Sequence, residues 1–182
     1  MKIRNLHNED IAACLSIYTC LSIYNWYIEH TTITFETEPL SLHAFIERAD
    51  TITKRYPWLV AEDAEHTIIG YAYLDTFNAR SAYEYTCDVS IYLDHEQRHH
   101  GTGTVLMQAL LDLAKEDGYH TAVSIVTQGN EPSEHLHEKC GFTKAGVLEH
   151  TGYKFEKWLS VTYYVKSLQN GDPHPLKNKE YV

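Results

Sequence analysis

Hydrophobic residues recur along the chain in two patterns, one that alternates or runs together and one that repeats every three or four residues. The first pattern predicts strands and the second predicts amphipathic helices. Strands are therefore expected at 2–4, 58–62, 68–77, 85–93, 121–126, 142–149 and 158–165. Helices are expected after the first strand, at 41–55, between Gly103 and Gly118, and at 132–139. This order of elements predicts an α/β (α+β) fold in which helices flank a mixed sheet.

The length of the chain sets the expected number of domains. A chain of 182 residues with 43% hydrophobic content suits one compact domain with an ordinary core. We expect this domain to cover residues 1–166. The remaining residues, 167–182, include two prolines and few apolar side chains, and they are expected to form a surface tail.

A tandem repeat interrupts the first predicted helix, where residues 14–19 are followed by a near copy at 20–25. Six residues advance a helix by about 600°, which shifts its face by roughly a third of a turn. The extra copy must therefore lengthen the helix with a rotated face, or form a bulge or loop.

One stretch predicts a ligand site as well as two elements of structure. The strand Asp88–Leu93 is followed by a polar turn, by Gly101-Thr102-Gly103 and by an amphipathic helix. Two glycines separated by one residue let the backbone approach a ligand closely, and the free N–H groups at a helix start attract anionic oxygens. The stretch therefore predicts a phosphate or pyrophosphate site, with an ordinary tight turn as the alternative.

The turn lacks the residues of two common nucleotide loops. No Gly-Lys-Ser/Thr follows the glycines, so the lysine and the magnesium-binding hydroxyl of a nucleotide-hydrolysing loop are missing. A dinucleotide fingerprint would need a glycine or alanine where Leu106 stands. The remaining pattern, Arg98-x-x-Gly101-x-Gly103, resembles the pyrophosphate loop with which GNAT-type N-acetyltransferases hold coenzyme A.

Further segments strengthen this resemblance. Asn130-Glu131-Pro132-Ser133, leading to Gly141-Phe142, is similar to the family's later segment of coenzyme-contacting asparagine, short helix and strand. The segments 32–39, 55–62, 78–83 and 152–154 resemble the phosphinothricin acetyltransferase branch. The resemblance implies a GNAT fold with a mostly antiparallel sheet and a splayed central strand pair, acetyl-CoA as co-substrate, and a homodimer.

The resemblance also implies roles for individual residues. Acetyl transfer to an amine needs a base, oxyanion stabilisation and a proton for the leaving thiolate. Asp88 stands where the family has a glutamate base, and its shorter side chain implies a raised pKa or an intervening water. Glu84, expected on the same strand face, competes for this role. His137 stands where the branch has a histidine and many relatives a proton-donating tyrosine. The alternatives are solvated strand acids and a structural histidine.

Binding residues are implied in the same way. The N–H groups of Ile91 and Leu93, on either side of Tyr92, are expected to contact the thioester and the pantetheine arm as an added strand would. The remaining coenzyme residues are expected to be Arg98, His99, His100, Gly101, Thr102, Gly103, Thr104 and Asn130. The acceptor is expected among Phe35, Arg80, Tyr83 and Lys154, since arginine offers a bidentate fork for carboxylate and phosphinate groups. The alternative for the two cations is an exposed surface charge.

Bulk properties exclude several classes of partner. The net charge of −10 argues against nucleic acid, because phosphate backbones are held by clustered lysine and arginine. No apolar run of membrane-spanning length and no leader pattern is found, so we expect a cytoplasmic protein that does not bind membranes. The four cysteines have no CxxC spacing and the histidines no zinc-ligand spacing, so buried thiols and no metal are expected.

Three hypotheses for the function follow. The first is an acetyl-CoA-dependent N-acetyltransferase for a small amino acid or analogue, such as phosphinothricin or methionine sulfoximine. The second is a coenzyme A-binding module without catalysis, in which the repeat distorts the acceptor site and Asp88 is too short to act as the base. The third is an N-terminal acetyltransferase for peptides or proteins, which the acidic surface favours.

Overall fold

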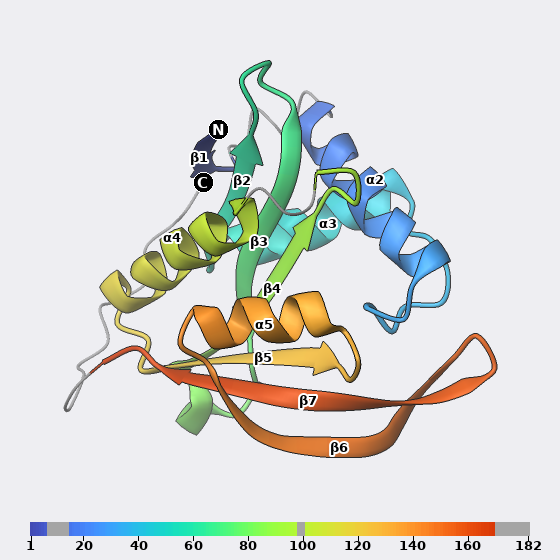
Figure 1. The fold of residues 1–182 in the computed structure, drawn as a ribbon. Coiled ribbons are helices and arrows are strands. Elements are labelled where there is room, and N and C mark those ends of the chain that lie inside the picture. Colours follow the sequence, from blue (N-terminus) through green and yellow to red (C-terminus); the bar gives the residue numbers. More distant parts are fainter. Residues whose placement is uncertain (7–14, 98–100, 170–182) are drawn as a thin grey trace.

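The computed structural model describes residues 1–6, 15–97 and 101–169, which form one seven-stranded sheet flanked by helices (Figure 1). The strands are β1 (Lys2–Asn5), β2 (Trp58–Glu62), β3 (Ile68–Thr76), β4 (Thr86–Leu93), β5 (Thr121–Thr127), β6 (Thr143–Lys154) and β7 (Lys157–Ser167). The helices are α2 (Leu15–His30), α3 (Leu42–Thr53), the 3-10 helix η1 (Ser81–Tyr83), α4 (Thr102–Glu116) and α5 (Glu131–Lys139). The strand order is β1-β2-β3-β4-β5-β7-β6, and only β4 and β5 run parallel. The predicted fold class is confirmed.

The helices cover both faces of the sheet. Figure 1 shows α4 and α5 on the near face, whereas α2 and α3 lie behind and beside β3 and β4. An aromatic layer fills the space under α2 and α3, where Phe45 packs against Trp58 and Tyr71. Trp58 also stacks on Tyr73 at 4.4 Å between ring centroids. Because these large rings are almost fully buried, they fix the position of β3 and β4 beneath the helices.

The central strands separate after a short parallel contact. Thr86–Asp88 of β4 pairs with Thr121–Val123 of β5, and no further pair joins the two strands. Beyond this contact β4 and β5 diverge, and α5 lies across the opening between them (Figure 1). The predicted splayed pair is therefore confirmed. The splay leaves the edge of β4 from Val89 to Leu93 without a neighbouring strand on that side.

Helix α2 passes through the repeat without a break from Leu15 onward. Of the two equivalent tyrosines, Tyr18 is 59% exposed whereas Tyr24 is 5% exposed and packs against Tyr92. This difference follows from the rotation of about a third of a turn that six residues impose on a helix. The extra copy thus lengthens the helix with a rotated face, which settles the alternatives left open by the sequence.

Two expectations about local structure are wrong. Glu84 does not share a strand face with Asp88, because β4 begins at Thr86 and Glu84 is an exposed residue at the end of η1. The surface tail does not begin at residue 167, since Ser167 belongs to β7 and Leu168 is 7% exposed. The backbone N–H of Leu168 donates to the carbonyl of His120, which holds this residue against the domain. The other tail residues lie outside the described ranges.

Within the described ranges, no helix is both long and apolar enough to cross a membrane. The same ranges contain no cluster of three or more His, Cys, Asp or Glu side chains that could hold a metal ion. Cys20, Cys87 and Cys140 are buried free thiols.

Candidate active site

The splay between β4 and β5 opens into a cleft bounded by the end of β4, the start of α4 and one face of α5. Seven of the predicted coenzyme residues line it, namely Ile91, Tyr92, Leu93, Gly101, Gly103, Thr104 and Asn130. Thr102 is buried in the first turn of α4 and does not line the cleft. Arg98, His99 and His100 lie outside the described residues. The structure therefore brings residues separated by up to 39 positions into one elongated site.

Glycine is needed at positions 101 and 103 for different structural reasons. Gly101 is the N-cap of α4 with φ of 79° and ψ of −2°, a left-handed conformation that favours glycine. Its carbonyl accepts from the N–H groups of Thr104 and Val105, which begins the helix and leaves the earlier N–H groups without an intrahelical acceptor. A Cβ at Gly103 would lie 3.2 Å from Leu93 and 3.3 Å from Leu136. Glycine there lets β4 and α5 close around the start of the helix.

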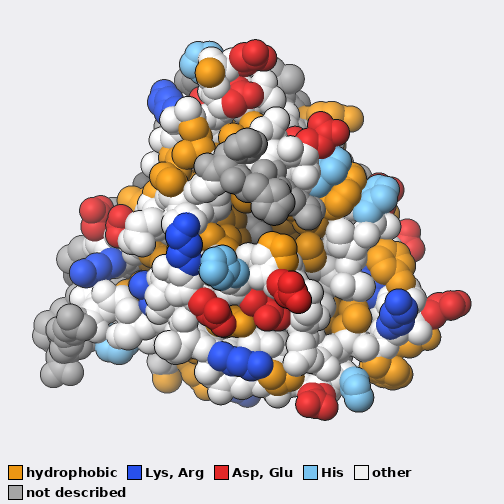
Figure 2. Space-filling view, in the orientation of Figure 1, with side chains coloured by type: hydrophobic (Ala, Val, Ile, Leu, Met, Phe, Trp, Pro, Cys, Tyr) orange, Lys and Arg blue, Asp and Glu red, His pale blue; other side chains and the backbone are white. Residues whose placement is uncertain are grey.

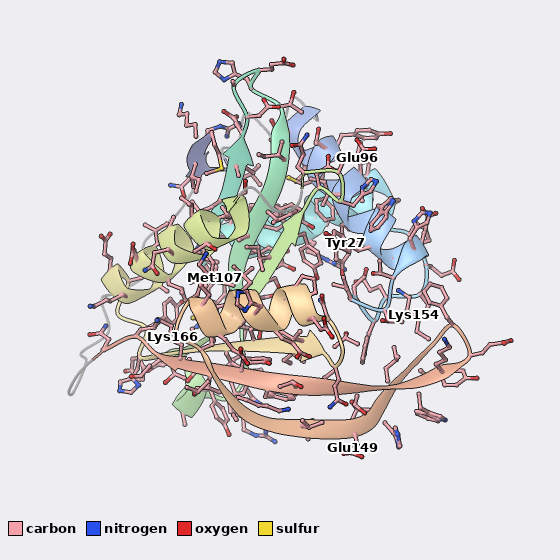
Figure 3. The ribbon with its side chains drawn as sticks, in the orientation of Figure 1. Tyr27, Glu96, Met107, Glu149, Lys154 and Lys166 are labelled. Carbon is pink, nitrogen blue, oxygen red and sulfur yellow. The ribbon has the colours of Figure 1, made fainter. Side chains whose placement is uncertain are left out.

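A tyrosine that the sequence interpretation missed fixes the open end of β4. The Tyr27 hydroxyl donates to the carbonyl of Leu93 at 2.7 Å, although the two residues are 66 positions apart. Figure 3 shows Tyr27 on α2 beside the end of β4. No local sequence signal relates these residues. The hydrogen bond uses only the Leu93 carbonyl and leaves the strand's N–H groups free for a ligand.

The other missed lining residues are Ile33 and, on α5, Pro132, Ser133, His135, Leu136 and Lys139. The α5 residues recur at helical spacing and form one face of the helix, a signal that could have identified them. Among these lining residues Lys139 carries a positive charge, and it lies in the last turn of α5. Figure 2 shows acidic side chains gathered over the outer face of α5 beside the cleft. On α5, Glu131 and Glu138 are exposed. Lys139 thus supplies local positive charge at an otherwise acidic rim.

His137 lines a narrower cavity that adjoins the cleft and shares Ile91, Asn130 and Ser133 with it. The ring is 1% exposed, and its Nδ1 lies 2.7 Å from the carbonyl of Ser133. Because a carbonyl only accepts, Nδ1 carries the proton of the neutral ring. Nε2 is buried without a partner among the described residues. Burial lowers the pKa of His137 below its usual 6.5, which favours this neutral tautomer at neutral pH.

Asp88 lies on β4 at the last residue of the short parallel contact, where the strands begin to diverge. Its Oδ1 is buried and has no hydrogen-bond partner among the described residues. Burial raises the pKa of Asp88 from 3.8 to about 7, with a further contribution from the nearby carboxylate of Asp75. A carboxylate with a pKa near neutrality is a stronger base than an ordinary aspartate. The raised pKa expected for Asp88 is thus a property of the structure.

The four predicted acceptor residues form two separate groups. Phe35 and Lys154 meet at the turn between β6 and β7: the Phe35 ring packs over Gly152, and the Lys154 amino group donates to the carbonyl of Thr34 at 2.9 Å. Figure 3 shows Lys154 at this turn, beneath the loop that follows α2. Lys154 is 3% exposed, so the alternative of an exposed surface charge is wrong for it.

Arg80 and Tyr83 belong to a different part of the molecule. Arg80 caps η1 and is exposed, while Tyr83 is 42% exposed and packs against Phe77. Figure 1 shows η1 at the lower left and the turn between β6 and β7 at the far right. One chain therefore does not gather all four acceptor candidates around a single point.

The cleft fits acetyl-CoA by the chemistry of its lining. The N-terminus of α4 offers N–H groups to a pyrophosphate, and the unpaired edge of β4 offers N–H groups to an extended amide-containing arm. Apolar side chains of Ile33, Leu93 and Leu136 line the space between these two polar sites. The arm would place its thioester at the splay, close to Asp88 and His137.

This fold and site are those of an acetyltransferase, and comparison with known sequences agrees. The acetyltransferase (GNAT) family model matches residues 20–142, and the chain belongs to this family. The chain is also 35% identical to a phosphinothricin N-acetyltransferase of Streptomyces viridochromogenes, over 97% of this chain and 93% of that protein. It is 34% identical to an L-methionine sulfoximine/L-methionine sulfone acetyltransferase of Pseudomonas aeruginosa, over 79% and 84% of the two chains.

Solved structures give the same result. A GNAT superfamily phosphinothricin acetyltransferase from Sinorhizobium meliloti in complex with AcCoA superposes with a TM-score of 0.87, at 29% identity, over 97% of this chain and 93% of that one. An N-acetyltransferase from Staphylococcus aureus gives a TM-score of 0.84 at 34% identity, over 92% and 98%. The predicted branch and the predicted co-substrate, acetyl-CoA, are confirmed.

Proposed function

We propose that this chain transfers the acetyl group of acetyl-CoA to the amino group of a small amino acid or analogue, of the phosphinothricin or methionine sulfoximine type. One observation carries the proposal: the cavity that adjoins the coenzyme cleft reaches Val89, the residue after Asp88, and the Oδ1 atom of Asp88 is buried without a partner among the described residues. A thioester held along β4 would thus meet a base of raised pKa. The names of the similar proteins support the class of acceptor.

The reaction then proceeds by direct transfer. Asp88 takes a proton from the acceptor's ammonium group, and the free amine attacks the thioester carbonyl. Backbone N–H groups at the free edge of β4, such as that of Ile91, which lines the cleft, stabilise the oxyanion that develops. The C–S bond breaks, and the thiolate of coenzyme A receives a proton.

The geometry of His137 changes the way in which it would supply that proton. A neutral ring with its proton on Nδ1 has a bare Nε2, which accepts a proton and cannot give one. We therefore propose that Nε2 first takes the second proton from the attacking nitrogen and then passes it to the sulfur. His137→Ala should lower turnover about a hundredfold while acetyl-CoA binding remains nearly unchanged. Wild-type turnover in that variant would return His137 to a structural role in its contacts with Phe142 and Tyr164.

We further propose that the protein is a cytoplasmic homodimer. The turn between β6 and β7 exposes Tyr153, Phe155 and Trp158, each by more than half, next to the free edge of β6. An exposed aromatic group beside an unpaired edge strand favours association with another chain. Buried free thiols are consistent with a reducing compartment.

Light scattering tests the dimer. Trp158→Glu should convert a dimer into a monomer, because the charge would be buried at the interface without a partner. Lys115→Glu, a charge change at an exposed site of α4 outside the proposed interface, is the matched control and should leave the dimer intact. A wild-type monomer at micromolar concentration would contradict the proposal.

The release of coenzyme A thiol on mixing with acetyl-CoA tests the activity. The acceptor panel should contain phosphinothricin, methionine sulfoximine, methionine sulfone, the standard amino acids and short peptides. Turnover with free amino acid analogues and none with peptides supports the proposal, and the reverse supports a peptide acetyltransferase. Tight acetyl-CoA binding without turnover of any amine would support the non-catalytic module. A continuous α2 that packs Tyr24 into the core removes the distortion on which that alternative relied.

A further inference from the structure

A second aspartate faces Asp88 from the neighbouring strand. In the antiparallel register of β3 and β4, Asp75 is directly opposite Asp88, and both side chains project from the same face of the sheet. The β-carbons of such a pair lie about 4.5–5.5 Å apart, a distance at which like charges repel each other. Neither carboxylate has an ion-pair partner among the residues the structure describes. Two unneutralised acids side by side in a sheet need a cation or a shared proton.

The surroundings of Asp75 leave it available to a ligand. Its Oδ1 accepts from the N–H of Thr76 at 2.6 Å, which fixes the carboxylate without neutralising it. On the side of α3, Asp75 lines a hollow with Tyr73, Glu47 and Arg48, among others. Tyr73 is kept neutral at ordinary pH by burial, which raises its pKa.

The cation of that hollow is already engaged. Arg48 forms an ion pair with Glu36, and its guanidinium lies 5.4 Å from the centre of the Tyr24 ring. Glu47 adds a further negative charge on α3. The charged groups around the pair are therefore Asp75 from β3, Glu47 and Arg48 from α3, and Glu36 from the loop after α2. No lysine or arginine of this set is free to neutralise Asp75 and Asp88.

We infer that Asp75 is a positioning residue for the acceptor, and that with Asp88 it holds the acceptor's ammonium group between two carboxylates. This inference rests on the proposed function, because it concerns the same site. The ammonium ion offers three N–H donors and one positive charge, which match two adjacent carboxylates. Binding between them relieves their repulsion and brings the nitrogen next to the base.

Asp88 and Asp75 also have different roles in the reaction. Asp88 removes one proton from the ammonium group, and the nitrogen lone pair then forms the bond to the thioester carbon. The electrons of the broken C–S bond remain on sulfur, which receives the second proton from the nitrogen. Asp75 keeps the protonated Asp88 and the nitrogen together. A shorter aspartate at position 88 can thus serve as the base, because its partner on β3 brings the ammonium group to it.

Steady-state kinetics of the full-length enzyme test this role with Asp75→Asn. The asparagine keeps the size of the side chain and the acceptor for the Thr76 N–H, so the change removes mainly the charge. For an amine that is protonated at pH 7, we expect KM to rise about tenfold, since a charge-assisted hydrogen bond is lost. For hydroxylamine, which is neutral at pH 7, KM should change less than twofold. The Kd of acetyl-CoA should not change.

The pH profile gives a second readout that a merely structural role would not move. Loss of the neighbouring negative charge lowers the pKa of Asp88, so the acid limb of kcat/KM should move to lower pH. Asp75→Glu, which restores the charge, should recover most of the affinity for the protonated amine. Asp112→Asn, an exposed aspartate on α4, is the matched control and should behave as wild type. Asp75→Ser repeats the test if Asp75→Asn does not fold.

The outcomes separate this inference from the proposed function. Equal KM changes for the protonated amine and for hydroxylamine, or an unmoved acid limb, would overturn the role of Asp75. If one of these results is found and Asp88→Asn loses turnover, the proposed function stands and only the role of Asp75 is overturned. A wild-type enzyme that acetylates no amine overturns both.

Discussion

Strand β4 carries two sites that are built in different ways. Its free edge, with the start of α4, forms a coenzyme cleft that depends on backbone N–H groups and on Gly101 and Gly103. One of its faces carries Asp88 and would form the proposed acceptor site, which depends on side chains from β3 and α3. A backbone site is encoded within one short stretch, whereas a side-chain site depends on strand register. The comparison implies that substitutions on one side should leave the other side unaffected.

The largest effect is expected from Asp88→Asn, which removes the proposed base and leaves the cleft lining unchanged. Turnover below the pKa of the acceptor amine should fall about 10²- to 10⁴-fold, the usual contribution of general-base catalysis. The defect should shrink as the pH approaches the pKa of the acceptor amine, because the amine is then deprotonated without a base. Isothermal titration with acetyl-CoA should give a wild-type Kd. Glu84→Gln should retain turnover, and loss of activity there would move the role of base to Glu84.

The same Asp88→Asn substitution should stabilise the fold above neutral pH. The pKa of Asp88 is about 7 in the folded chain and 3.8 when exposed, so the folded state retains a proton that the unfolded state releases. Stability therefore falls as the pH rises from about 4 to 7, and the loss is complete above that window. We expect a gain of about 2–4 kcal/mol at pH 8 and almost none at pH 4.

Urea unfolding of the two proteins at both pH values measures this gain. Asp112→Asn, which replaces an exposed acid, should show no comparable pH dependence. An equal gain at pH 4 and pH 8 would show that burial does not hold the proton on Asp88.

Gly101→Glu should act on the coenzyme side alone. The substitution places a side chain at φ of 79° and a negative charge beside the expected pyrophosphate, so the Kd of acetyl-CoA should rise well over tenfold. Gly141→Glu is the matched control, because Gly141 is exposed like Gly101, has φ of 85° and lies outside the cleft lining. Equal losses of acetyl-CoA affinity in the two variants would show that backbone strain causes the effect. Gly101 would then not lie beside the pyrophosphate.

The sequence predicts the coenzyme cleft better than the acceptor site, because the cleft depends on local patterns and the acceptor site depends on strand register. Gly101, Gly103 and Asn130 stand in local patterns that specify turns and helix starts, so the sequence predicts half of the cleft lining. Tyr27 was missed because its bond to Leu93 spans 66 residues. Asp75 was missed because its position opposite Asp88 depends on the register of β3 and β4.

Other errors had local causes. The sequence could not distinguish the residue that follows η1 from the residues that begin the next strand, and Glu84 was expected on the face of that strand in consequence. The fold itself was predicted almost completely, because β2 and β3 are short apolar runs and the apolar residues of α3 and α4 recur at helical spacing.

The smallest effect is expected at the rim of the cleft. Lys139 places a positive charge beside the site, while the chain as a whole carries −10 and would repel an anionic coenzyme. Lys139→Gln should weaken acetyl-CoA binding about two- to fivefold at low salt, the scale of one exposed ionic contact. Salt screens such contacts, so the difference from wild type should vanish near 1 M salt. Lys144→Gln, an exposed lysine on β6, makes the same change in net charge. Equal weakening in both variants would show that net charge acts on the coenzyme, whereas weakening in Lys139→Gln alone would show that this rim does.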